Sequence, residues 1–131
     1  MTRLAIAATL LLAACATTAA APEQRGPDRA TARIQRTLAG LTPSAPQRCL
    51  SRDKVNEIRT AEGVILYVAG RNRVWRNNIV GGCAGLSRGD IVVSTGTAGQ
   101  ICNGDIVQTR ARLGGQITGS CSLGEFVPYT R

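Results

Sequence analysis

Histidine is absent from this chain of 131 residues, and aromatic side chains are scarce: one Trp, one Phe and two Tyr. Without histidine, Ser-His-Asp and Cys-His catalytic sites and histidine metal ligands are excluded. Uncharged apolar runs are short, whereas a membrane-spanning helix needs about 20 apolar residues. These absences exclude many hydrolases.

The first 15 residues have the layout of a secretory signal peptide. A short basic start, Met1–Arg3, precedes an uncharged apolar run, Leu4–Leu12. The run ends in Leu12-Ala13-Ala14-Cys15, which resembles the bacterial lipobox. That resemblance implies removal of residues 1–14 and acylation of Cys15. The alternative is an ordinary secreted protein that is cleaved in the alanine run, after Ala20 or Ala21.

An acylated Cys15 would tie the protein to a membrane. One acyl chain anchors a protein only marginally, at about 0.8 kcal/mol per buried methylene, whereas several chains anchor it stably. Position 16 is Ala rather than Asp, which by resemblance to sorting patterns favours the outer membrane. We therefore predict a lipid-anchored envelope protein whose first partner is membrane lipid and which faces the periplasm from the outer membrane.

The charge of the chain is strongly positive. Removal of residues 1–14 leaves 15 basic and 8 acidic residues, a formal charge of +7, and only one basic residue of the chain is Lys. Arginine suits forked pairing with carboxylate or phosphate. This excess of basic residues favours an anionic partner, although solubility and non-specific attraction explain a positive charge equally well.

Four cysteines remain once Cys15 is assigned to lipid: Cys49, Cys83, Cys102 and Cys121. An even number in an exported domain predicts two disulfides. A four-cysteine zinc site is the rival, but no pair has the short spacing of such sites. Three pairings are possible, and we favour the nested one, Cys83 with Cys102 and Cys49 with Cys121, because it closes a hairpin and ties the ends of the domain together.

Residues 15–47 are expected to form a tether and residues 48–131 a small disulfide-bonded domain. Residues 16–27 show no apolar periodicity. Asp28 can cap a helix, and Ile34, Leu38 and Leu41 then follow at helical spacing. This basic amphipathic segment could lie against anionic lipid headgroups or against the domain. Because isolated helices this short are marginal, a partly disordered linker is the favoured interpretation.

The domain has the pattern of short strands separated by glycine-rich turns. Leu50–Arg59 could hold a strand or one helical turn. Regular short strands without a long helix predict an all-β fold, a small barrel or sandwich. The expected strands are Val64–Val68 and Val74–Val80, paired as a hairpin, then Ile91–Ser94, Ile106–Thr109, Arg112–Ile117 and Phe126–Tyr129.

Three carboxylates occupy similar places, after a glycine and before an apolar pair: Asp90, Asp105 and Glu125. They could be an acid and base pair or calcium ligands. An acidic residue at a strand entry more often bonds the backbone amides of its turn, which is the interpretation we favour. We therefore predict no metal site and no cofactor.

The densest basic run holds Arg71, Arg73, Trp75 and Arg76, our candidate binding residues. Nucleic-acid binders interleave aromatic and basic residues, but one Trp is thin support and the envelope is the wrong place for nucleic acid. A solvated hairpin with Trp75 in the core is the alternative without a ligand. If the run binds a ligand, an anionic envelope protein, a glycan or lipopolysaccharide phosphate is the expected target.

Short motifs in a fixed order resemble a family of small proteobacterial lipoproteins classed only as a domain of unknown function. The resemblance covers about Cys49 to Tyr129 and implies an exported, disulfide-bonded domain without catalytic residues to transfer. The motifs are Cys49-Leu50, the Val64–Val68 strand, Arg73-Val74-Trp75, Cys83-Ala84-Gly85-Leu86, Ile101-Cys102-Asn103-Gly104-Asp105 and the stretch from Cys121 to Tyr129.

Three functions stay open at this point. The first is a non-enzymatic module that binds an anionic envelope partner. The second is an accessory that packs against an outer-membrane complex through its β edges. The third is an enzyme that uses carboxylates alone, which needs two acids close together across a cleft.

Overall fold

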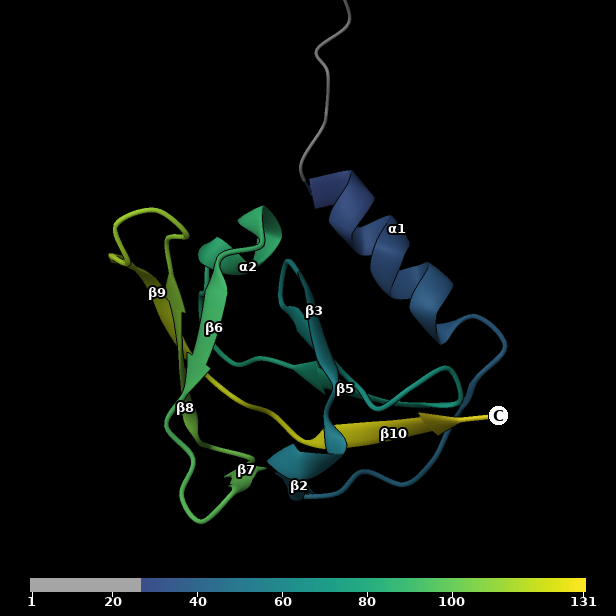
Figure 1. The fold of residues 1–131 in the computed structure, drawn as a ribbon. Helices are drawn as coiled ribbons and strands as arrows, with labels where there is room; N and C mark the ends of the chain where they lie inside the picture. The colour runs from purple at the N-terminus through teal and green to yellow at the C-terminus, as the bar shows by residue number, and fades with distance from the viewer. Residues whose placement is uncertain (1–26) are drawn as a thin grey trace, which may run out of the picture.

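The computed structural model describes residues 27–131, so the predictions on residues 1–26, including the signal peptide and Cys15, lie outside the described residues. The described chain is mostly β, with one long helix and one short helix (Figure 1). Its elements are α1 (Pro27–Leu38), β1 (Thr42–Pro43), β2 (Cys49–Ser51), a 3-10 turn (Arg52–Lys54), β3 (Glu57–Ala61), β4 (Val64–Val68), β5 (Arg73–Asn78), α2 (Gly85–Arg88), β6 (Ile91–Ser94), β7 (Gln100–Cys102), β8 (Ile106–Arg110), β9 (Ile117–Ser122) and β10 (Phe126–Thr130).

The strands form three antiparallel sheets. The largest has the order β1-β10-β5-β4-β3, the second the order β6-β8-β9, and the third is the pair β2-β7. The two smaller sheets lie on one side of the five-stranded sheet and α1 lies on the other (Figure 1). The predicted all-β, disulfide-bonded fold is therefore confirmed as a sandwich rather than a closed barrel.

Each face of the five-stranded sheet carries its own apolar cluster, because successive side chains of a strand point to opposite faces. The larger cluster fills the space toward the smaller sheets and α2, and the smaller one lies under α1. The larger cluster contains Leu50, Ile65, Tyr67, Trp75, Cys83, Leu86, Ile101, Val107, Cys121, Leu123 and Phe126. The smaller contains Ile34, Ala61, Leu66, Val68 and Val74.

Helix α1 packs against the five-stranded sheet instead of forming part of a linker. Ile34 is only 5% exposed and shares a cluster with sheet residues, and Leu38 and Leu41 pack against the same cluster. The preference for a partly disordered linker at these residues is wrong, because a short helix that buries its apolar stripe gains the packing that an isolated helix lacks. No helix within residues 27–131 is long and apolar enough to cross a membrane.

Most of the predicted strands are confirmed. Val64–Val68 and Ile91–Ser94 are β4 and β6. The strand expected at Val74–Val80 is β5, which ends at Asn78 and forms the expected hairpin with β4. Ile106–Thr109 and Phe126–Tyr129 fall within β8 and β10. The segment Leu50–Arg59, for which both choices were open, contains strand and 3-10 turn in succession.

The predicted strand Arg112–Ile117 is wrong. Residues 112–114 form a turn, and β9 begins only at Ile117. Gly114 and Gly115 have φ angles of 81° and 67°. Such left-handed backbone is readily adopted by glycine and interrupts a strand. The apolar residues Leu113 and Ile117 suggested a strand, but the two glycines between them decide the conformation.

Both predicted disulfides form, but the favoured nested pairing is wrong. Cys49 bonds Cys102, and Cys83 bonds Cys121, so the two bridges cross in the sequence. Cys49 and Cys102 are direct register partners of β2 and β7. The pairing follows from this strand register between segments 53 residues apart, which local spacing does not reveal.

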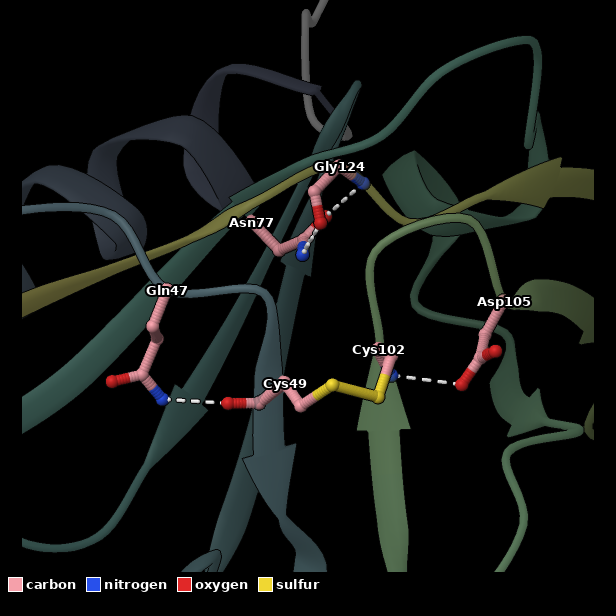
Figure 2. The surroundings of a disulfide bond; sticks show 6 residues. All are labelled: Gln47, Cys49, Asn77, Cys102, Asp105 and Gly124. Carbon is pink, nitrogen blue, oxygen red and sulfur yellow. Dashed lines mark hydrogen bonds between the residues drawn. A yellow bond between two sulfur atoms is a disulfide. The ribbon is translucent and has the colours of Figure 1, made fainter.

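Asn77 and Tyr67 are both buried, but only the polar group of Asn77 is hydrogen-bonded within the described residues. Asn77 is fully buried; its Nδ2 donates to the Gly124 carbonyl at 2.8 Å and its Oδ1 accepts from the Gly124 N–H at 2.9 Å (Figure 2). A Cβ at Gly124 would collide with the carbonyl oxygen of Asn78. The buried hydroxyl of Tyr67 has no hydrogen-bond partner among the described residues. Burial raises the pKa of Tyr67.

The crossed pairing makes a specific prediction for a tryptic digest without reduction. Arg48, Arg52, Arg76, Arg88 and Arg112 place every paired cysteine in a different peptide. We expect peptide 49–52 linked to peptide 89–110, and peptide 77–88 linked to peptide 113–131, by mass spectrometry. Nested bridges would instead link 77–88 to 89–110, and that product would contradict the pairing described here.

A second prediction compares Asn77 with Tyr67. Asn77→Ala should lower the free energy of unfolding by about 3 kcal/mol, because it leaves both backbone groups of Gly124 unpaired inside the protein. Tyr67→Phe should change it by less than about 1 kcal/mol, or raise it, because the hydroxyl that it removes makes no bond. Urea unfolding with the disulfides intact measures both changes. If the two variants lost the same free energy of unfolding, the predicted difference between Asn77 and Tyr67 would be wrong.

Candidate anion-binding site

The arginines of the basic run chosen from the sequence lie on different sides of the sheet, because most of the run forms β5. Arg71 lies in the exposed turn that precedes β5, and Arg73 opens the strand. Since side chains alternate along a strand, Arg73 shares a face with Trp75, whereas Arg76 lies on the opposite face with Val74. Arg76 is half-buried, and its Nε donates to Asn78 Oδ1 at 3.1 Å. The three arginines therefore do not form one patch.

Trp75 belongs to the core. Its side chain is 5% exposed, and it pairs in register with Tyr67 on one side and Pro128 on the other. This confirms the interpretation that the single Trp packs inside the domain. With so little of its side chain exposed, Trp75 cannot stack on a ligand as an exposed aromatic ring stacks on a base.

Arg73 and Trp75 line a cavity of about 450 Å³ where β2 approaches β5 and β10. Lys54 supplies a second positive charge there, from the 3-10 turn after β2. Both basic side chains are exposed, and none of the lining residues is acidic. The lining consists of Gln47, Cys49, Leu50, Ser51, Lys54, Arg73, Trp75, Gln100, Pro128 and Thr130.

Covalent and hydrogen bonds hold the walls of this cavity. The Cys49–Cys102 disulfide joins β2 to β7, as Figure 2 shows. The Gln47 backbone exchanges two hydrogen bonds with Phe126 of β10, and its side-chain amide donates to the Cys49 carbonyl at 2.8 Å. On the other side, Asp105 accepts a bond from the Cys102 amide at 2.8 Å. The cavity is therefore built on a fixed frame.

Sequence reasoning found Arg73 and Trp75 but missed the rest of the lining. Lys54, Gln47, Gln100 and Thr130 come from four other segments of the chain. Thr130 lies beside Arg73 only because β10 pairs with β5. The one local signal that could have indicated the site is Cys49, whose bridge ties β2 in place.

A second cavity, of about 550 Å³, lies between α1, β3, α2 and β6. Five arginines line it: Arg29, Arg33, Arg59, Arg88 and Arg112. The two carboxylates in its wall are each paired with a neighbour. Arg59 Nε lies 2.8 Å from Glu57, and Arg88 lies 3.1 Å from Asp90.

The charges around this second cavity keep both carboxylates ionised. The hydrogen bond from Arg59 lowers the pKa of Glu57, and the charge of Arg33 acts in the same direction. The Thr118 hydroxyl, 2.7 Å from Asp90, lowers the pKa of that carboxyl, with a further contribution from Arg88. Two carboxylates still face five guanidiniums, so the wall keeps an excess of positive charge.

No protein-family model, curated protein or solved structure gives a significant match to this chain. The resemblance to small lipoproteins therefore stays a prediction, and a function has to be argued from the cavities themselves.

The three carboxylates noted in the sequence have different surroundings. Asp105 bonds a backbone amide of its own turn, that of Cys102, as predicted. Asp90 differs from the prediction, because it accepts from the side chains of Thr118 and Arg88. Glu125 is exposed. Among residues 27–131, no three His, Cys, Asp or Glu side chains gather closely enough to hold a metal ion.

Proposed function

We propose that the protein is a lipid-anchored module of the cell envelope that binds an anionic group of an envelope partner in the cavity beside Cys49–Cys102. The observation that carries this proposal is the lining: Arg73 and Lys54 both line the cavity, and no lining residue is acidic. The partner is an anionic protein, a glycan or lipopolysaccharide. Catalysis, a cofactor and nucleic acid have no part in it.

The side chains of the cavity suit a phosphate or a carboxylate. The Arg73 guanidinium can donate two parallel hydrogen bonds to such a group, and the Lys54 ammonium adds a compact charge. Gln47 and Gln100 can donate through amides, and Ser51 through a hydroxyl. A volume of about 450 Å³ is within the range of small-ligand sites.

A second candidate function is that of an accessory that packs on an outer-membrane complex. The outer face of the β6-β8-β9 sheet favours it, because four apolar side chains there are between 38% and 55% exposed: Ile91, Val93, Ile106 and Ile117. Binding through such a face would be insensitive to salt, since apolar contacts are not screened by ions. Salt dependence therefore separates the two candidates.

The binding proposal predicts that Lys54→Gln combined with Arg73→Gln weakens the affinity for phosphorylated lipopolysaccharide by at least about tenfold. The reason is that hydrogen bonds to charged groups contribute about 1.5 to 3 kcal/mol, and about 1.4 kcal/mol is tenfold. Titration calorimetry of the lipidated protein in a nonionic detergent measures the affinity at several salt concentrations. Dephosphorylated lipopolysaccharide should bind much more weakly.

The matched control is Arg71→Gln combined with Arg76→Gln. It also removes two positive charges but leaves the cavity intact, because neither residue lines it. This pair should change the affinity by less than about twofold, the effect of distant exposed charges. If both double variants lose affinity equally, the binding reflects only the overall positive charge of the domain. If neither does, the accessory function is favoured.

The anchor predicts that Cys15→Ser abolishes labelling of the protein by a fatty-acid probe in cells. Without the thiol, no diacyl group can attach, so the product should be unprocessed or released from the membrane. Gel fluorescence of the probe and membrane fractionation measure the two effects. Labelling that persists in the variant would refute the assignment of Cys15.

A further inference from the structure

One end of the domain gathers three features that a membrane surface would contact. In Figure 1 the start of α1, α2 and the loop between β8 and β9 all lie at the same end of the molecule, away from β2 and β7. Four of the arginines of the second cavity come from this end: Arg29, Arg33, Arg88 and Arg112. Asp90 pairs with Arg88 at this end, and the other three arginines leave it with an excess of positive charge.

The loop at this end, residues 111–116, presents an apolar tip. Leu113 is 88% exposed, the most exposed of the large apolar side chains that the structure describes. The loop is not loosely attached, because Arg110 donates to the Gly115 carbonyl and Ala111 N–H donates to Gln116. Leu113 therefore stands out from a fixed turn next to Arg112.

The three segments of this end form one firm surface. Arg112 Nε donates to the Gly89 carbonyl at 2.8 Å, which ties the loop to the end of α2. Thr60 of β3 donates to the Leu86 carbonyl of α2 at 2.9 Å. Arg59, also of β3, donates to Thr37 of α1 at 2.7 Å. These hydrogen bonds hold the arginines and Leu113 at fixed positions relative to one another.

From these contacts we infer that this end of the domain docks on a phospholipid leaflet with anionic headgroups. The arginines pair with headgroup phosphates, and Leu113 enters the boundary between headgroups and acyl chains. The inference rests on the proposed anchor at Cys15. The chain advances by twelve residues from Cys15 to Pro27, a distance of at most about 40 Å, and α1 begins at the basic end. Connectivity and charge therefore both favour a membrane as the occupant.

Docking would fix the orientation of the proposed binding site. The cavity with Arg73 and Lys54 lies beside β2, and Figure 1 places β2 and β7 at the end opposite to α2 and the 111–116 loop. With the basic end on the leaflet, that cavity opens away from the membrane. A soluble or membrane-distant partner could then reach it.

Depth-dependent quenching tests the inference. The lipidated protein carrying Leu113→Trp is placed on vesicles rich in phosphatidylglycerol whose acyl chains are brominated, and the loss of fluorescence is measured. The control is Ile106→Trp, an apolar site that is 45% exposed, against 88% for Leu113, and that lies at the other end of β8. The buried Trp75 contributes the same background to both. We expect strong quenching for Leu113→Trp and little for Ile106→Trp, with the difference reduced by salt.

Removal of arginines should weaken the docking. Arg29→Gln with Arg33→Gln, made in the Leu113→Trp protein, should lower the ratio of docked to undocked protein by about thirtyfold, which corresponds to about 1 kcal/mol for each arginine. Arg36→Gln with Arg71→Gln removes the same charge outside the cavity and should have little effect. Equal quenching at positions 106 and 113, or stronger quenching at 106, would overturn the inference.

The test of the docking surface can be distinguished from the test of the anchor at Cys15. The mass of the purified protein shows whether Cys15 carries lipid. The quenching comparison can also be made with unlipidated protein that is added to the vesicles. A lipidated protein whose Leu113→Trp fluorescence is not quenched would leave the anchor intact and remove only the docking surface.

Discussion

The paired hydrogen bonds between Asn77 and Gly124 hold the chain where it passes from one layer of the sandwich to the other. Gly124 lies between β9 and β10, so it connects the three-stranded sheet to the five-stranded sheet. The buried side-chain amide of Asn77 bonds both the N–H and the carbonyl of Gly124. The direction in which the chain enters β10 is thereby fixed, and with it the position of Thr130 beside Arg73. The candidate anion site thus depends on an interaction that lies outside its cavity.

Local pattern predicted much of this fold. The run Val64–Val68 is apolar throughout because both faces of β4 are covered, one by α1 and the other by the smaller sheets. The failures arose where a distant contact or a local backbone preference outweighed apolar content. Ile34 needed the sheet to stabilise its helix, and Gly114 and Gly115 turned a run with apolar residues into a loop. The cysteine pairing depended on the register of β2 with β7.

The candidate site was less predictable than the fold, because its residues are neighbours only after folding. Arg73 could be chosen from a basic run, but nothing near Lys54 in the sequence distinguishes it from a solvated charge. The arginines of the second cavity are spread from position 29 to position 112. Charge in this protein is therefore sorted by the fold: an acid-free cavity lies by β2, and a larger basic wall lies by α2.

The crossed bridges also govern what happens to the molecule after its backbone is broken. A single break anywhere between Cys49 and Cys121 leaves both pieces joined, because at least one bridge spans every bond in that interval. Two breaks in different intervals between cysteines still leave one connected molecule. Nested bridges would lose the segment that holds Cys83 and Cys102 if one break fell between Cys49 and Cys83 and the other between Cys102 and Cys121. Where proteases cut the chain, the domain would remain whole through damage that would shed part of a chain with nested bridges.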